Sequence, residues 1–140
     1  YSLSYEMRTT YMNLLLTSRR FIALGAFIAF LSVALGAFGA HAVKNSITPE
    51  LMRVYQTAVD YQFYHALGLI LIGLIYQLHQ SRLITVAGWL MLTGIVIFSG
   101  SLYILSLSGI RWLGAITPIG GTAFIAAWLF LFYALIRPAK

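Results

Sequence analysis

Residues 21–43 read FIALGAFIAFLSVALGAFGAHAV, an apolar stretch without a charged side chain that ends on glycines, alanines and His41. A helix needs about 20 predominantly apolar residues to cross the hydrocarbon core of a bilayer. Arg19 and Arg20 precede the stretch and Lys44 follows it, which is the flanking pattern of a membrane span. Residues 21–43 therefore predict a transmembrane helix.

The composition of the whole chain agrees with this interpretation. Of the 140 residues, 61% are hydrophobic and 9% are charged, which predicts an integral membrane protein. The chain has no cysteine, and this excludes disulfides, thiol nucleophiles and thiolate metal sites. The net charge of +6 comes from residues scattered between apolar segments, so no basic face for nucleic acid is expected.

Four membrane spans are expected, at about residues 21–43, 61–78, 84–107 and 117–136. Thr48 and Pro49 begin an amphipathic lead-in to the second span. Residues 1–20 have neither a long apolar core nor a small-residue cleavage site, so we expect a cytoplasmic leader rather than a secretory signal. A remnant of organelle targeting is the alternative for this leader, and residues 138–140 are expected to be a cytoplasmic C-terminus.

The distribution of basic residues predicts the orientation of the spans. Short loops rich in Lys and Arg tend to remain in the cytoplasm. One side of the predicted topology carries Arg8, Arg19, Arg20, Arg82, Arg137 and Lys140, and the other carries Lys44, Arg53 and Arg111. Both termini should therefore be cytoplasmic. Because the connections are short, the fold class is an all-α, antiparallel four-helix bundle within the membrane.

Small residues recur at spacings of three or four in the first span and reappear in the third and fourth. Such residues let helix backbones approach closely in lipid. We expect helix packing at Gly25, Ala29, Ser32, Gly36, Gly39, Gly100, Gly120 and Gly121. A ligand groove along the first span is the alternative.

Polar motifs occur late in the first and third spans and early in the second and fourth. Because alternate spans run in opposite directions, these motifs should meet near the non-cytoplasmic end. The candidate cluster consists of His41, Asp60, Tyr61, Gln62, His65, Ser99, Ser101, Tyr103 and Thr117. Asp60 should remain at the interface because a carboxylate at the bilayer centre costs about 2.5–3.5 kcal/mol. His41 should bond to water, a carbonyl, Asp60 or a tyrosine.

Four motifs carry a resemblance to a known family: GAFGAH at 36–41, Tyr61-Gln62 with His65, FSGSLY at 98–103 and TPIGG at 117–121. They resemble the YgdD/YwdK family of small bacterial inner-membrane proteins, known as domain of unknown function 423, whose eukaryotic relatives are called transmembrane protein 256. The likeness covers about residues 19–137. It implies a four-helix membrane protein with no assigned reaction and no established catalytic residues.

Three kinds of chemistry remain alternatives for the cluster. His41 and His65 suit the axial ligands of a haem or part of a metal site, although glycine-rich packing closes the slot that a haem needs. A proton or small-solute path would need ionisable residues through the depth of the membrane, and the middle of every span lacks Asp, Glu, Lys and Arg. Ser99 and Ser101 with a nearby histidine suggest hydrolysis, but the nucleophile-elbow pattern is absent.

We therefore expect a non-enzymatic, multi-pass protein that acts by contact with other membrane components, as an accessory or assembly subunit. Its partners would be the lipid bilayer and a larger membrane protein complex, and no catalytic residue, metal or cofactor is expected. The alternative is a binding site for haem, quinone or lipid near the outer face. The expected location is the bacterial inner membrane, or the mitochondrial inner membrane if the source is eukaryotic.

Overall fold

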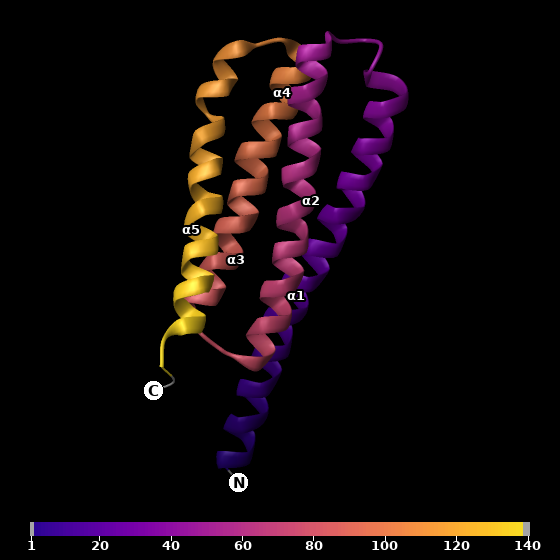
Figure 1. Ribbon diagram of the computed structural model, residues 1–140. Coiled ribbons are helices and arrows are strands. Elements are labelled where there is room, and N and C mark those ends of the chain that lie inside the picture. Colours follow the sequence, from indigo (N-terminus) through magenta and orange to yellow (C-terminus); the bar gives the residue numbers. More distant parts are fainter. Residues whose placement is uncertain (1, 139–140) are drawn as a thin grey trace.

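The computed structural model describes residues 2–138, which form helices joined by short loops (Figure 1). The helices are α1 (Ser2–Phe38), α2 (Pro49–Leu78), α3 (Arg82–Gly94), α4 (Gly100–Ser108) and α5 (Thr117–Ile136). A π-helical turn, Gly39–Val43, continues α1, a second one, Ile95–Ser99, joins α3 to α4, and a 3₁₀ turn, Arg111–Ala115, leads into α5. Within these residues, four helical runs are long and apolar enough to cross a membrane. The all-helical, four-span prediction is confirmed.

Local chemistry sets several of the helix ends. The Thr48 hydroxyl accepts a hydrogen bond from the Leu51 amide at 3.2 Å, and Pro49 follows as the first residue of α2. Ser81 caps α3 in the same way. Gly109 ends α4 with a φ of 73°, a left-handed conformation that glycine adopts without steric cost.

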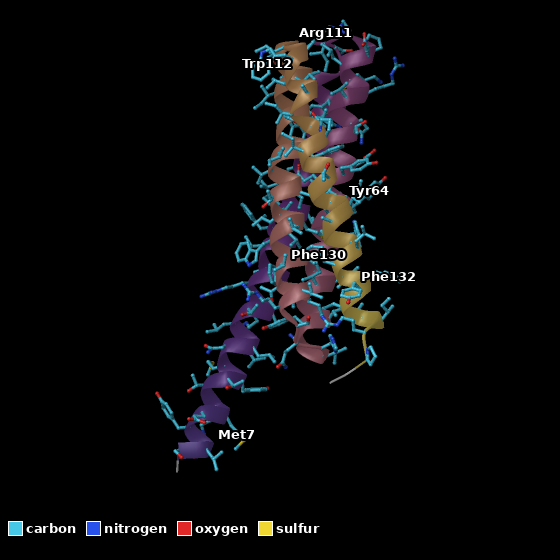
Figure 2. All side chains as sticks on the ribbon, turned by 90° about the vertical axis from the view of Figure 1, so that its left-hand side faces the viewer. Met7, Tyr64, Arg111, Trp112, Phe130 and Phe132 are labelled. Carbon is cyan, nitrogen blue, oxygen red and sulfur yellow. The ribbon has the colours of Figure 1, made fainter. Side chains whose placement is uncertain are left out.

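The four spans form an antiparallel bundle in which α1 and α5 are the outer members (Figure 1). α1 packs along α2, α5 packs along α3, and α2 also contacts α3 and α4. Both described chain ends and the α2–α3 loop lie at one end, which we call the terminal end (Figure 1). Residues 44–48 and 109–116 lie at the other, which we call the loop end. Figure 2 shows Arg111 and Trp112 at the loop end and Met7 at the terminal end.

The core runs along the middle of the bundle. Phe21 of α1, Leu69 and Ile72 of α2, and Ile84 and Met91 of α3 are almost entirely buried. Large apolar side chains such as Phe132 remain on the outside (Figure 2), as expected where lipid is the solvent. Close helix approaches occur at glycines of α1, α2, α3 and α5.

Two segments differ from the expected boundaries. The leader expected at residues 1–20 is helical from Ser2 onward and continues into the first span without a break. The second span begins at Pro49, because the amphipathic lead-in and residues 61–78 form one 30-residue helix. Of the expected C-terminal segment 138–140, residues 139 and 140 lie outside the described residues.

Candidate functional site

A buried glutamine joins three helices in the half of the bundle nearer the loop end. The Gln62 side chain is only 5% exposed. Its amide nitrogen donates to the Ile28 carbonyl of α1 at 3.1 Å, and its amide oxygen accepts from the Tyr103 hydroxyl of α4 at 2.6 Å. Gln62 and Tyr103, two members of the expected cluster, therefore meet as the spacing of the motifs predicted.

Serine hydroxyls form three further links between the spans. Ser32 donates to the Val59 carbonyl at 2.8 Å, which ties α1 to α2. Ser99, in the π-helical turn of the third span, donates to the Ala58 carbonyl of α2 at 2.8 Å. The hydroxyls of Ser101 and Thr117 lie 2.7 Å apart and join α4 to α5, with a further bond from Ser101 to the Phe98 carbonyl.

His65 is buried and held on both ring nitrogens. Its Nδ1 lies 2.7 Å from the Tyr61 carbonyl, and its Nε2 accepts from the indole N–H of Trp128 at 3.1 Å. Because the indole can only donate, Nε2 carries no proton and the ring is the neutral Nδ1–H tautomer. The ring also stacks on Phe124, with centroids 3.5 Å apart and planes 12° apart. Neither nitrogen has a lone pair left for a metal.

His41 does not join the cluster. It lies exposed in the π-helical turn at the loop end, and its side chain makes no hydrogen bond or ring contact with any other residue of 2–138. Its neighbour Gly39 packs against the Tyr55 ring, which is ten residues before His65 and thus about 15 Å away along α2. The two histidines are therefore too far apart in depth to be axial ligands of one haem. Among the described residues, no three His, Asp or Glu side chains gather as a metal site.

Asp60 lies beside the apolar stretch of α1 rather than beyond its end. The preceding carbonyl, that of Val59, is bonded to Ser32 in the middle of residues 21–43. The Asp60 carboxylate accepts a hydrogen bond from the Gln56 side-chain amide at 2.8 Å. Asp60 also lines a groove of about 390 Å³ between α1 and α2. The other lining residues are Ser32, Val33, Gly36, Ala37, Val59, Phe63 and Tyr64. Figure 2 shows Tyr64 on the outer surface of the bundle.

Tyr61, the remaining member of the expected cluster, makes ring contacts rather than side-chain hydrogen bonds. Its ring is partly exposed and lies between those of Phe98 and His65, at centroid distances of 4.7 Å and 5.9 Å. Tyr61 thus acts as an aromatic contact between α2 and the third span. Within the described residues its hydroxyl has no hydrogen-bond partner.

The expected packing glycines divide into tight and loose positions. A Cβ on Gly25 would lie 2.6 Å from the Ala66 carbonyl oxygen, and Cβ atoms on Gly39 and Gly120 would overlap Tyr55 and Phe98. Gly36 is close to Val59, Ala29 packs on the core, and Gly121 has ordinary contacts. The expectation for Gly100 is wrong, because nothing lies within 4 Å of a Cβ placed there. A side chain at Gly100 would therefore enter open space.

Several contributors were not expected from the sequence. Gly68, Gly73, Gly88 and Gly94 are also close packing positions. Their signal is present in the second and third spans, where they recur at intervals of five or six rather than four. At the terminal end, Ser18 donates to the Gly73 carbonyl at 2.8 Å and accepts from the Gln77 amide at 2.7 Å. Ser18 and Gln77 could have been noticed as polar residues close to the ends of apolar stretches. No sequence signal pointed from Trp128 to His65.

Comparisons with known proteins agree with this architecture. The model of a family described as a protein of unknown function (DUF423) matches residues 35–121. A UPF0382 membrane protein of Staphylococcus haemolyticus is 52% identical over 117 residues, which are 84% of this chain and 95% of the relative. The UPF0382 membrane protein YwdK of Bacillus subtilis is 50% identical over 118 residues, 84% of this chain and 96% of the relative. No solved structure matches the chain significantly.

The family model covers more than half of the chain, and the relatives match over nearly their whole length. Both relatives are named as membrane proteins, in agreement with the four apolar helical runs. The chain therefore belongs to the DUF423 family and is a multi-pass membrane protein.

Proposed function

We propose that this protein is a non-enzymatic accessory subunit that docks a second membrane protein in the groove between α1 and α2. The observation that carries the proposal is the carboxylate of Asp60 in the wall of that groove. An ionisable residue within a membrane span is costly and usually has a functional partner. The partner expected here is a transmembrane helix that brings a basic or hydrogen-bond-donating side chain to Asp60.

The charge of Asp60 is not compensated within the described residues. Glu50, at the loop end, has Arg111 at 3.7 Å, but no Lys, Arg or His nitrogen in residues 2–138 lies within 4 Å of Asp60. Its one hydrogen bond comes from the neutral amide of Gln56. A cationic group on a partner would therefore be attracted to this position, and the attraction is stronger in lipid than in water.

The shape of the groove suits a helix. Gly36 and Ala37 line it and project little from α1, so a partner backbone can approach closely. Along this part of α1, the helix packs on α2, and its other flank faces outward (Figure 1). Phe63 and Tyr64 add apolar and aromatic area on the α2 side of the groove.

Saturated hydrogen bonding supports the non-enzymatic part of the proposal. Every buried side-chain nitrogen or oxygen among the described residues has a partner. Ser99 and Ser101 donate to protein oxygens, and His65 has no free nitrogen with which to take a proton from either. A nucleophile needs an adjacent base with an available lone pair. The polar cluster therefore fits a role in holding the helices together.

Site-specific photocrosslinking in native membranes tests the proposal. A benzoylphenylalanine at Tyr64 would sample the groove, and the same probe at Leu129, an exposed position on α5, is the control. We expect the Tyr64 probe to crosslink one membrane-spanning segment that carries Lys, Arg or another donor. Asp60→Asn should lower the yield about tenfold, equivalent to about 1.4 kcal/mol, because it removes the charge and keeps the shape.

Glu50→Gln is the matched control, since it removes one carboxylate outside the groove and should leave the yield unchanged. Asp60→Glu should retain most of the crosslinking. The proposal would be abandoned if the Tyr64 probe labelled only lipid or quinone, since the groove would then be a site for an amphiphile. Equal yields for the wild type and Asp60→Asn would also contradict it.

A further inference from the structure

A second recess, unrelated to the groove at Asp60, lies between α1 and α3 toward the terminal end. It is a crevice of about 120 Å³ lined by Thr17, Arg20, Phe21, Leu24, Thr85 and Trp89. Small-molecule sites usually have volumes of about 300–1,000 Å³. This crevice is therefore large enough for a compact polar group and too small for a whole drug-sized ligand.

The polar groups of the crevice are mainly unused hydrogen-bond donors. Within residues 2–138, the Arg20 guanidinium has no carboxylate partner, and the Thr17 hydroxyl and the Trp89 indole N–H have no hydrogen-bond acceptor. Only Thr85 has one, the Ser81 carbonyl at 3.4 Å. No Asp or Glu lines the crevice. A cation with neutral donors around it is the pattern that binds a phosphate group.

The walls of the crevice are fixed by the packing of one aromatic ring. Phe21 is 2% exposed and lies edge-on to Trp89, with ring centroids 5.5 Å apart. A Cβ on Gly88 would lie 2.6 Å from the Phe21 ring, so this ring cannot move toward α3. The segments of α1 and α3 that carry the donors are thus held together before any ligand arrives, which reduces the entropic cost of binding.

The depth of the crevice matches that of lipid phosphates. Arg20 directly precedes the apolar stretch that begins at Phe21, and tryptophans such as Trp89 are typical of the membrane interface. Arg19, Arg82 and Arg137 follow or precede apolar spans at the same end of the bundle. Leu24, one turn after Arg20, is only partly buried and continues the crevice with apolar surface, along which an acyl chain would lie.

From this arrangement we infer that the crevice between α1 and α3 binds the phosphodiester of an anionic phospholipid, with Arg20 as the charged ligand. Basic recesses between transmembrane helices are suited to acidic head groups. The glycerol backbone and acyl chains would remain in the leaflet on the terminal side. This site lies toward the opposite end of the bundle from Asp60, so the inference does not depend on the proposed accessory role.

Native mass spectrometry of the purified full chain tests the inference. Dioleoylphosphatidylglycerol is titrated against the detergent-solubilised wild type, Arg20→Gln and Arg19→Gln. Arg19 does not line the crevice, so the two variants lose the same charge at adjacent positions. We expect Arg20→Gln to weaken retention of the first lipid about tenfold and Arg19→Gln to change it less than twofold. Trp89→Phe, which keeps a ring and removes the N–H, should weaken retention severalfold.

Further arms separate the sources of the phosphate and control for folding. Dioleoylphosphatidylcholine has the same acyl chains without a net charge and should bind more weakly. Inorganic phosphate at millimolar concentration should not displace the lipid, and displacement would reassign the crevice to a soluble anion. Helical circular dichroism and a monodisperse elution profile verify that each variant is folded. Equal losses for Arg19→Gln and Arg20→Gln, or no loss for Arg20→Gln, would overturn the inference.

Discussion

The indole nitrogen of Trp128 lies 3.1 Å from Nε2 of His65 and joins α5 to α2 across the interior of the bundle. The same imidazole stacks on Phe124, one turn earlier on α5. α5 thus holds the ring by its face and by one nitrogen, while α2 holds the other nitrogen through the Tyr61 carbonyl. The histidine is positioned as a neutral acceptor in a helix–helix contact.

Trp128→Phe should destabilise the bundle by about 0.5–1.5 kcal/mol, because one interhelical hydrogen bond is lost and an aromatic ring is kept. The free energy of unfolding in mixed micelles measures this. Trp112→Phe, at an exposed residue of the loop end, is the control and should have no effect. Nitrogen-15 NMR of labelled histidine should find His65 protonated on Nδ1 alone. A doubly protonated ring would contradict the assigned tautomer.

Tyr103→Phe should cost about 1–3 kcal/mol, because it leaves the buried amide oxygen of Gln62 without its donor. In a double-mutant cycle with Gln62→Leu, the losses of unfolding free energy in the two single variants should sum to more than the loss in the double variant. Tyr133→Phe provides a control at an exposed tyrosine. Additive losses would mean that the two side chains stabilise the protein independently.

Gly120→Ala should destabilise the protein, whereas Gly100→Ala should leave its stability unchanged or raise it slightly. A Cβ on Gly120 would collide with the backbone of Phe98. The shifts that such overpacking forces typically lower the free energy of unfolding by about 1–3 kcal/mol. A Cβ on Gly100 would meet nothing within 4 Å, and alanine favours a helix over glycine. Thermal melting in detergent compares the two variants. A stable Gly120→Ala protein would show that α5 and the third span can separate at little cost.

The predicted orientation can be measured directly, because the chain has no cysteine. Single cysteines at Asn45 and Gln80 lie at opposite ends of the bundle. On intact cells, a membrane-impermeant maleimide should label Asn45→Cys and leave Gln80→Cys unlabelled until the membrane is opened. The reverse pattern would place both termini outside and would contradict the argument from the distribution of Lys and Arg.

The sequence was sufficient for the spans and for the depth of most polar motifs. Length and apolarity predict the crossings, and opposite directions predict that Gln62 and Tyr103 share a level, as they do. Rise along a helix is 1.5 Å per residue, so depth can be counted from residue numbers. The angular position of a side chain around its helix cannot be counted in this way when neighbours surround it on several sides.

His41 and Trp128 illustrate what the sequence left undetermined. His41 ends an apolar run as the cluster hypothesis requires, but it lies exposed at the loop end. Trp128 belongs to an aromatic-rich segment, and the composition of such a segment does not distinguish contact with lipid from contact with another helix. Which ring reaches His65 depends on how closely α5 approaches α2, and Trp128 lies 63 positions from His65 in the chain, beyond the reach of local sequence patterns.

The π-helical turn at Ile95–Ser99 has a consequence for the tolerance of this segment to length changes. Such a turn holds one residue more than an α-helical turn, so it shifts the following helix by about 100° around its axis. Deletion of a single residue there would let the third span become one regular helix, and Tyr103 would swing away from Gln62 while Met91 kept its place in the core. One surplus amino acid therefore acts as a rotational spacer, and natural insertions or deletions should avoid it.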